Sequence, residues 1–494
     1  MNTSDNKNPG VRVRFAPSPT GDPHVGNVRT AIFTWLFARH NSGDFILRIE
    51  DTDQTRKISG SVERIFDTLS WMGLDWDEGP DLGGPFQPYT QSERLNLYAC
   101  YAEKLIETGH AYKCFCSTER LQELRNNNRK NPDFTGYDRK CRDLDNYNEK
   151  VSNQKDFVVR FAMPKEGITD FNDLIRGDLS FDNRLQGDFV ILKSDGFPTY
   201  HLAHIVDDYK MEISHVIRSE EWLSSVPKHI QIYRAFGWEM PDLAHLPTIN
   251  APDKTKLSKR HGATSALEFR ELGYLPHSLF NFLSLLGWSL DGSTELFSVN
   301  DLVEKFSLER VSKSPAIFDI EKLNWMNGHY IRQLTDNELT EHLISYWDEH
   351  NPGFFSGKPD KQRVLKIVPL IRDRLKTLVD AAPLVTFFFK DDFSYEVSEL
   401  TQSGLNDCDT QNILTLVLEK INQVNSFDSE SLEIELRELA KSSGYKVGQV
   451  LGVIRVATSG LKVSPPLFGS LEILGKDRVI SDIQKAKRIL SKPN

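Results

Sequence analysis

The segment from residue 11 to residue 40 constrains the fold more than any other part of this 494-residue chain. An apolar run at residues 11–16 predicts a strand, and a loop with Gly21 and Gly26 follows it. A helix after the loop is indicated by apolar residues at helical spacing: Val28, Ala31, Ile32, Trp35 and Leu36. A loop that ends at a helix start directs free backbone N–H groups and the positive end of the helix dipole at an anion. This order predicts one half of a doubly wound, Rossmann-like nucleotide-binding fold.

A second segment, far along the chain, carries a complementary chemistry. Residues 256–260 (KLSKR) place two ammonium groups, a guanidinium and a hydroxyl within five positions. Such a cluster can neutralise the charge that develops on a departing phosphate group. We therefore expect residues 17–27 and residues 256–260 to build one nucleotide triphosphate site from two distant parts of the chain.

Six segments in this order resemble the class I aminoacyl-tRNA synthetases, and the bacterial glutamyl-tRNA synthetases among them. They are residues 14–21 (RFAPSPTG), 24–27 (HVGN), 48–53 (RIEDTD), 200–203 (YHLA), 216–222 (VIRSEEW) and 256–260 (KLSKR). Residues 24–27 stand in the place of the HIGH signature and residues 256–260 in the place of KMSKS. The resemblance is specific from about residue 11 to residue 328 and weaker from there to the C-terminus.

The resemblance implies a glutamate–tRNA ligase. Such an enzyme activates L-glutamate with ATP and Mg²⁺ to glutamyl-adenylate, then transfers glutamate to the 3′-terminal adenosine of tRNA(Glu), releasing AMP and diphosphate. His24, Lys256 and Lys259 are the catalytic residues that it implies. Its ATP-binding residues are Pro17, Ser18, Thr20, Gly21, His24, Gly26, Asn27, Lys256, Leu257, Ser258, Lys259 and Arg260.

The amino-acid site implied by the resemblance is rich in charge. It comprises Arg14, Ala16, Ser18, Glu50, Tyr200, His204 and Arg218. Glutamate has two carboxylates and one ammonium, so a specific site needs cations for the acids and an anion for the amine. Arg218 is expected to grip the side-chain carboxylate with two parallel hydrogen bonds, and Glu50 to face the ammonium. His204 stands where some relatives carry asparagine.

The expected fold is α/β: a split Rossmann-like catalytic domain with an α+β insertion, followed by an all-α C-terminal anticodon-binding region. Strand and helix patterns alternate up to about residue 250, and helical patterns dominate beyond about residue 334. We predict catalytic half 1 at residues 1–94, an inserted acceptor-end-binding domain at 95–200 and catalytic half 2 at 201–252. A stem-contact domain with the KLSKR loop should follow at 253–334, and the helical anticodon-binding region at 335–494.

Two further sites are expected. Cys114, Cys116 and Cys141 can place three thiolates around a zinc ion, with either Asp143 or Tyr137 as the fourth ligand. Related bacterial enzymes carry zinc in this region, and three reduced cysteines without metal remain the alternative. By resemblance Arg374 helps to read the anticodon and so to discriminate the glutamate tRNA; a plain helix-surface arginine is the alternative.

The composition is that of a globular protein: 39% of the residues are apolar and 26% are charged. No run of about 18 apolar residues occurs, and residues 1–9 are too polar for a secretory signal, so no membrane partner is expected. Five cysteines in so long a chain favour a reducing compartment, here the cytoplasm. A net charge of −10 predicts a modest, salt-sensitive contact with tRNA. The family expectation is a monomer.

The sequence disfavours three other classes of protein. The shorter relative that glutamylates a modified base in aspartate tRNA lacks a helical tail, whereas about 160 residues follow residue 334 here. Glutaminyl-tRNA synthetases carry a β-barrel anticodon region instead of a helical one. A catalytically silent tRNA-binding paralogue is expected to lose His24, Lys256 or Lys259, and all three are present.

Overall fold

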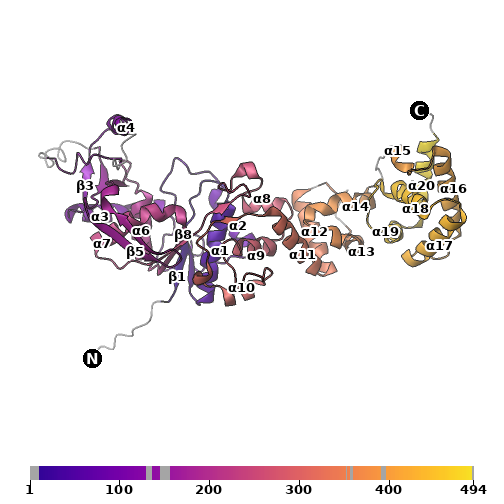
Figure 1. Ribbon diagram of the computed structural model, residues 1–494, viewed down its shortest axis with the longest axis horizontal. Coiled ribbons are helices and arrows are strands. Elements are labelled where there is room, and N and C mark those ends of the chain that lie inside the picture. Colours follow the sequence, from indigo (N-terminus) through magenta and orange to yellow (C-terminus); the bar gives the residue numbers. More distant parts are fainter. Residues whose placement is uncertain are drawn as a thin grey trace, which may run out of the picture. The chain divides into compact units, whose positions relative to one another are not determined.

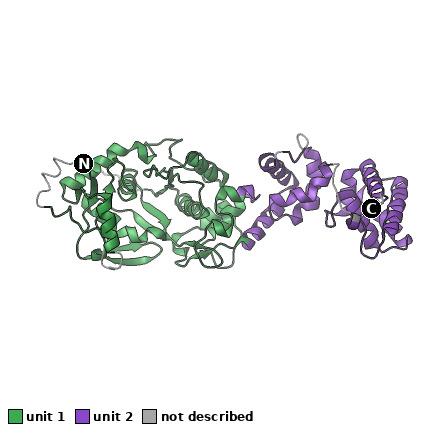
Figure 2. Ribbon diagram, turned by 90° about the horizontal axis from the view of Figure 1, so that it is seen from above, with its two compact units in different colours: residues 1–269, 276–320 green, residues 270–275, 321–494 purple. Residues whose placement is uncertain are grey.

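The computed structural model describes residues 10–128, 136–144, 156–351, 353–355, 360–390 and 397–491 (Figure 1). The expectation for residues 1–9 lies outside these ranges. The chain divides into two compact units, coloured separately in Figure 2. Unit 1 comprises Met1–Phe269 and Pro276–Ile320, and unit 2 comprises Arg270–Leu275 and Glu321–Asn494. The domain boundary predicted at residues 334 and 335 falls inside unit 2, and the finer five-part division remains a prediction.

The expected strand–helix–strand start is present in unit 1. Strand β1 (Arg12–Phe15) pairs in parallel with β2 (Asp44–Leu47), and α1 (Val25–His40) connects them. The helix ends before Gly43, where an added Cβ would lie 2.2 Å from the carbonyl oxygen of Val11. Only glycine lets the chain turn so closely beside β1.

The second half of the catalytic fold contributes two strands to a four-stranded sheet. Its order is β6 (Gly177–Asp182), β5 (Ile168–Asp173), β9 (Asp242–Leu246) and β8 (His215–Ser219). Strands β8 (His215–Ser219) and β9 (Asp242–Leu246) are parallel, and α7 (Val226–Phe236) connects them. The backbone N–H of Ser214 donates to the carbonyl of Arg12 at 2.9 Å, which puts the start of β8 beside β1. The two halves of the split fold therefore meet at this point.

The other two strands of this sheet come from the segment that was predicted as the insertion. Strands β5 (Ile168–Asp173) and β6 (Gly177–Asp182) form a hairpin, and β5 pairs in parallel with β9. Burial alternates strictly along β5, with Thr169, Phe171 and Asp173 buried, and the buried face packs in a core with Ile230 of α7 and Leu243 of β9.

The rest of the insertion has a sheet of its own. Strands β3 (Ala111–Cys114), β4 (Val158–Phe161) and β7 (Phe189–Leu192) are antiparallel neighbours. Helices α3 (Leu95–Glu107) and α6 (Tyr200–Lys210) share a buried core with this sheet. That core includes Tyr98, Leu105, Phe161, Ile191 and Leu202.

Further helices and strands belong to unit 1, apart from the last two residues of α8, Arg270 and Glu271, which belong to unit 2. They are α2 (Ser61–Trp71), α4 (Thr118–Asn127), β10 (Ile249–Asn250), α8 (Ala266–Glu271), α9 (Pro276–Ser284), α10 (Val299–Lys305) and β11 (Ala316–Ile317). Strands β10 and β11 pair in parallel.

Every regular element among the described residues of unit 2 is a helix, as expected. Its helices are α11 (Ile320–Gln333), α12 (Asp336–His350), α13 (Lys361–Ile371), α14 (Ala381–Phe389), α15 (Val397–Leu400), α16 (Asp407–Gln423), α17 (Ser429–Ser442), α18 (Val447–Ser459), α19 (Leu467–Leu474) and α20 (Lys476–Leu490). The helices from α16 to α20 pack through buried apolar residues at helical spacing, among them Ile413, Leu436, Val453 and Ile483. Among the described helices, none combines the length and the apolar character that crossing a bilayer requires.

Candidate active site

Residues from both predicted nucleotide segments line one cavity of about 420 Å³ in unit 1. Its lining includes His24, Gly26, Asn27, Lys256, Leu257, Ser258 and Lys259. A backbone hydrogen bond of 2.8 Å from the N–H of Val25 to the carbonyl of Thr264 joins the first segment to the loop that follows the second. The two distant stretches meet at this cavity, which we name the nucleotide cavity.

His24 is the N-cap residue of α1. Its Nδ1 accepts a hydrogen bond from the backbone N–H of Gly26 at 3.1 Å. Burial, and next the nearby Lys256 ammonium, lower the pKa of His24, so the ring is neutral at pH 7. With Nδ1 accepting, the proton of the neutral ring is on Nε2, which can donate to a ligand oxygen.

The lysine loop is held by its own side chains. Ser258 and His261 form a capping box around a short 3₁₀ turn (Lys259–His261). The ammonium of Lys256 pairs with the carboxylate of Glu221, which also lines the nucleotide cavity. Arg260 lies outside this lining, and its guanidinium donates to the hydroxyl of Thr255 at 2.9 Å.

A second cavity of about 790 Å³ adjoins the first, since Asn27 and Ser219 line both. We name it the amino-acid cavity. It collects six of the seven residues predicted to bind glutamate: Arg14, Ala16, Ser18, Glu50, Tyr200 and Arg218. Pro17 and Thr20, predicted to bind ATP, line this second cavity, whereas Gly21 lines neither.

Arg14 and Glu50 belong to a buried network of charges. Arg14 makes two hydrogen bonds to Asp208, of 2.9 and 3.2 Å. Arg48 donates to Asp208 at 2.8 Å and to Glu50 at 2.9 Å. Burial raises the pKa of Glu50, although Arg48 and Arg14 oppose the rise. Burial also acts to raise the pKa of Asp208, but Arg14 and Arg48 outweigh it and hold that pKa low.

Arg218 is buried without a carboxylate partner among the residues that the structure describes. Each of its three nitrogens donates to an uncharged group instead. Nε bonds Nε2 of His245 at 3.1 Å, Nη1 bonds the hydroxyl of Tyr200 at 3.0 Å, and Nη2 bonds Nδ1 of His229 at 3.2 Å. A buried cation whose charge is not compensated is costly, so this arrangement points to a bound anion.

His204 lies one layer behind the amino-acid cavity. Its ring stacks on Tyr200 with 4.3 Å between ring centroids, and its Nδ1 is 2.6 Å from the carbonyl oxygen of Tyr200. It supports the tyrosine and does not line the cavity.

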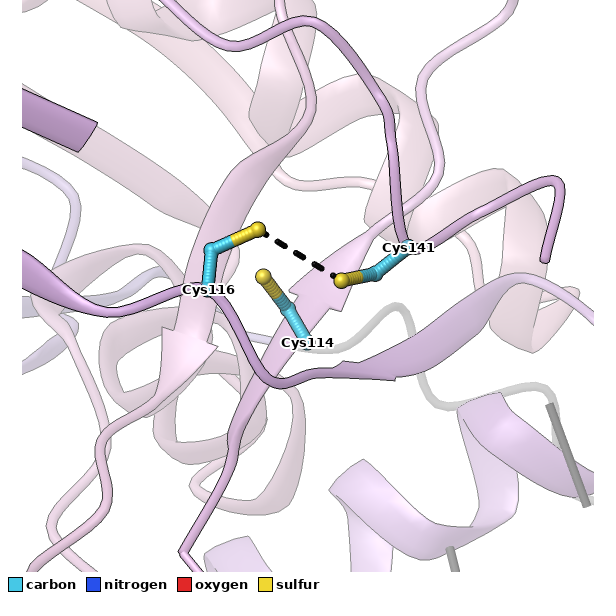
Figure 3. A group of neighbouring side chains, drawn as sticks. All are labelled: Cys114, Cys116 and Cys141. Atoms are coloured by element: carbon cyan, nitrogen blue, oxygen red, sulfur yellow. Dashed lines mark hydrogen bonds between the residues drawn. The ribbon is translucent and has the colours of Figure 1, made fainter. Parts of the chain in front are cut away.

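The three cysteines of the insertion point toward one another, as Figure 3 shows, and their sulfur atoms all lie within 4.8 Å of each other. The hydroxyl of Tyr137 lies 3.4 Å from the sulfur of Cys114 and 3.6 Å from that of Cys116. The carboxylate of Asp143 is exposed and pairs with Lys165 at 3.2 Å. The three thiols and the phenol oxygen lie close enough together to share one ion, whereas Asp143 points to Lys165, so the geometry favours Tyr137 as the fourth ligand.

Comparison with known proteins agrees with this geometry. Residues 10–325 match the family described as class I tRNA synthetases (E and Q), catalytic domain, and residues 338–487 match an anticodon binding domain. The glutamate–tRNA ligase of Dehalococcoides mccartyi is 50% identical over 481 residues, which cover 97% of this chain and 98% of that protein. The corresponding ligase of Moorella thermoacetica is 43% identical over 486 residues, with 97% and 98% coverage.

The chain belongs to the glutamate–tRNA ligase family. A crystal structure of a glutamate tRNA ligase from Elizabethkingia meningosepticum, in complex with its amino acid, matches at a TM-score of 0.86. It is 36% identical, and the match covers 98% of this chain and 100% of that one. The family and the fold class predicted from the six segments are confirmed.

Within this family's anticodon domain, Arg374 lies exposed in a 3₁₀ turn (Arg372–Arg374) of unit 2. Its Nη1 donates to the carbonyl of Ser464 at 2.8 Å, and Arg455 donates to the same oxygen at 3.3 Å. Burial and then repulsion from Arg374 lower the pKa of Arg455. Arg374 therefore belongs to a positive cluster of two arginines.

Several residues of the two cavities were not predicted from the sequence. Trp222 lines the amino-acid cavity and packs on Tyr200 with 4.0 Å between ring centroids. Glu221, Thr248, Lys193, Asp195 and Arg56 line one or other cavity. Three further residues lie behind Arg218: His229, His245 and Asp173. His245 could have been suspected from the sequence, because it stands between Ala244 and Leu246 in an apolar strand, where a buried polar side chain requires a hydrogen-bond partner.

Proposed function

We propose that this chain is a glutamate–tRNA ligase that works in two steps. The substrate carboxylate attacks the α-phosphorus of ATP and diphosphate leaves. The 3′-terminal adenosine of tRNA(Glu) then takes the glutamyl group from AMP. Two adjoining cavities support this proposal: Lys256 and Lys259 line one of them, and Arg14 and Arg218 line the other. No covalent protein nucleophile is required, so the protein acts by placement and charge stabilisation.

The nucleotide cavity is assigned to ATP. His24 donates from Nε2 to a phosphate oxygen, and the backbone at Gly26 lies close enough for the adenine to pack on it. Lys256 and Lys259 bind the departing diphosphate, with Ser258 as a hydroxyl donor. Asn27, shared by both cavities, lies where the α-phosphate must meet the amino acid. Mg²⁺ enters as part of the ATP substrate.

The hydrogen bonds of Arg218 are the main support for glutamate as the amino-acid substrate. A guanidinium has five N–H donors, and Tyr200, His229 and His245 take one from each nitrogen. Two donors remain, one on each terminal nitrogen, and the two oxygens of a carboxylate can accept from two such N–H donors of one guanidinium. The amide of glutamine offers neither the charge nor two acceptors. Glu50, whose pKa burial raises, gains a favourable partner when the substrate ammonium arrives.

The insertion is assigned a structural zinc ion held by Cys114, Cys116, Cys141 and Tyr137. The hydrogen bond between the two thiols is the largest effect on both: it lowers the pKa of Cys114 and raises the pKa of Cys141. A thiolate is the form that binds zinc. When bound, the ion would join strand β3 to the segment at residues 136–144 and leave no position open for catalysis.

The remaining partners follow from the family. Unit 2 is assigned to the anticodon arm of tRNA(Glu), with Arg374 beside the base that distinguishes glutamate from glutamine tRNA. The short relative without a helical tail is disfavoured by the helices of unit 2. We further propose a monomer that acts in the cytoplasm, where five unpaired cysteines stay reduced.

ATP–diphosphate exchange tests the proposed function. Wild-type protein is assayed with glutamate, glutamine and aspartate, each with and without tRNA(Glu). Of the three amino acids, we expect only glutamate to support exchange, and only when tRNA(Glu) is present. Exchange with glutamine as efficient as with glutamate, or none with glutamate under any condition, would refute the proposal.

The substitution Lys259→Ala tests the role of the lysine loop. We expect the exchange rate to fall by about 100-fold or more while the KM for glutamate changes little, because the lysine acts on the leaving diphosphate. Lys305→Ala on α10 is the control, since its side chain is exposed and lies outside both cavities. An unchanged exchange rate in the Lys259 variant would remove the assignment.

A further inference from the structure

Near the carboxyl ends of three neighbouring parallel strands, three side chains contact one another in series. Arg218 on β8 stands opposite His245 on β9 in the strand register, and Asp173 is the last residue of β5, the next strand along. Nε of Arg218 donates to Nε2 of His245 at 3.1 Å, and Nδ1 of His245 lies 2.6 Å from Oδ2 of Asp173. All three residues are buried, so the line runs from the amino-acid cavity into the sheet.

The hydrogen bonds fix which nitrogen of His245 carries the proton. A guanidinium N–H can only donate, so Nε2 of His245 must accept and its proton must be on Nδ1. That Nδ1 proton is the one that Asp173 accepts. Asp173 is itself held by the backbone N–H groups of Ile175, Arg176 and His245, at 3.0, 2.9 and 3.3 Å. A rigid carboxylate therefore sets the tautomer of the ring that meets Arg218.

A second ring behaves in the same way. Nδ1 of His229 accepts from Nη2 of Arg218, so its proton is on Nε2, which lies 3.0 Å from Nδ1 of His201. Charged groups around these rings besides Arg218 are Asp173, Arg176 and Lys228, from β5, the turn after it and α7. The guanidinium of Arg218 therefore donates to two uncharged imidazole rings, those of His245 and His229.

The contrast with Arg14 explains why the acceptors are uncharged. Arg14 donates two hydrogen bonds to the carboxylate of Asp208, which neutralises the charge of the Arg14 guanidinium inside the protein. A carboxylate placed directly on Arg218 would do the same and occupy the donors that a ligand needs. An imidazole between Arg218 and Asp173 orients the guanidinium through one hydrogen bond and leaves its charge and its two free donors to a ligand.

We propose that His245 and Asp173 are positioning residues that aim the two free N–H donors of Arg218 at the side-chain carboxylate of the amino-acid substrate. This inference rests on the proposed function, because it names what sets the specificity of the same site. Asp173 comes from the hairpin β5–β6, within the segment predicted as the insertion, so that segment contributes to the amino-acid pocket.

A pair of substitutions at His245 tests the proposal. Glutamine at this position can place its amide oxygen near the site of Nε2 and accept from Arg218. Asparagine is shorter, ends near the site of Nδ1, and reaches Asp173 only. In the exchange assay we expect His245→Asn to raise the KM for glutamate by about 10- to 100-fold, the usual range for a lost hydrogen bond to a charged group. His245→Gln should stay within about threefold of wild type, and the KM for ATP should be unchanged in both.

The outcomes separate this proposal from a purely structural role. A higher glutamate KM in the asparagine variant with near wild-type kcat, together with rescue by glutamine, supports positioning. An unchanged glutamate KM in His245→Asn, or an equal rise in both variants, overturns it, and a thermal unfolding midpoint for each variant identifies loss of folding. Asp173→Asn should raise the glutamate KM in the same direction but less, since a neutral amide is the weaker acceptor for Nδ1. If wild type shows no exchange with glutamate, the proposed function fails and not this inference alone.

Discussion

At the scale of single residues, the amino-acid cavity is unusual in the number of histidines behind it. Burial is the largest effect on His201, His204, His229 and His245 and lowers the pKa of each below the ordinary value of 6.5. For His201 the pKa falls to about 4. The folded protein therefore holds these rings neutral at a pH where the unfolded chain already binds protons.

This difference predicts how stability depends on pH. Below pH 6.5 the unfolded state binds more protons than the folded state, so the free energy of unfolding falls as the pH is lowered. Each such histidine contributes up to about 1.4 kcal/mol per pH unit. His204→Asn should therefore reduce the slope by up to this amount between pH 6.5 and about pH 5, measured by urea unfolding at several pH values.

The matched control is His110→Asn, because His110 is exposed. Its slope should equal that of wild type. An unaltered slope in the His204 variant would contradict the assignment of a neutral buried ring at that position.

At the scale of elements, the cysteine cluster brings together strand β3, the loop after it and the segment at residues 136–144. Cys114 ends strand β3, Cys116 follows in the next loop, and Cys141 and Tyr137 come from the segment at residues 136–144. Their shared apolar core is small, with Leu121, Leu124 and Val158 packed against it. A bound ion would supply stability that so small a core cannot.

Metal analysis of protein purified without chelator tests this site. We expect about one zinc per chain, falling to near zero in Cys141→Ser. Removing the ion should lower the thermal unfolding midpoint by about 4 °C or more. Cys100→Ser and Cys408→Ser are the controls, because both thiols are exposed and lie outside the cluster. Wild-type protein without bound metal would favour the alternative of three reduced cysteines.

The elements also indicate how much of the structure the sequence could predict. The strand at residues 12–15, the helix after it and the helices of unit 2 follow from local periodicity, so their prediction succeeded. The hairpin at residues 168–182 was placed in the insertion because nothing local reveals that β5 pairs with β9, more than 60 residues later. Arg218 was found from its motif, whereas His229, His245 and Asp173 were missed because only the fold brings them to its guanidinium.

At the scale of the whole molecule, charge is the feature that bears on the tRNA. The chain carries a net charge of −10, so attraction to a polyanion must come from local clusters such as Arg374 with Arg455. Few phosphate contacts give a contact that dissociates readily, as an enzyme requires between turnovers.

The affinity for tRNA(Glu) should therefore depend on salt, but moderately. With roughly three or four neutralised phosphates, the Kd should rise by about 40- to 150-fold between about 50 and 200 mM salt. Filter binding or fluorescence anisotropy can measure the Kd at each concentration. A Kd that is nearly independent of salt would contradict a contact made through phosphates.

The neutral surroundings of Arg218 have one more consequence. In the empty enzyme this guanidinium is a buried cation whose neutralisation is left to whatever enters the cavity. We therefore expect small inorganic anions such as chloride or sulfate to bind weakly beside this guanidinium and to compete with the amino acid. The pocket must therefore discriminate between glutamate and small anions. Glutamate is favoured by its shape and by its ammonium group, which Glu50 can bind.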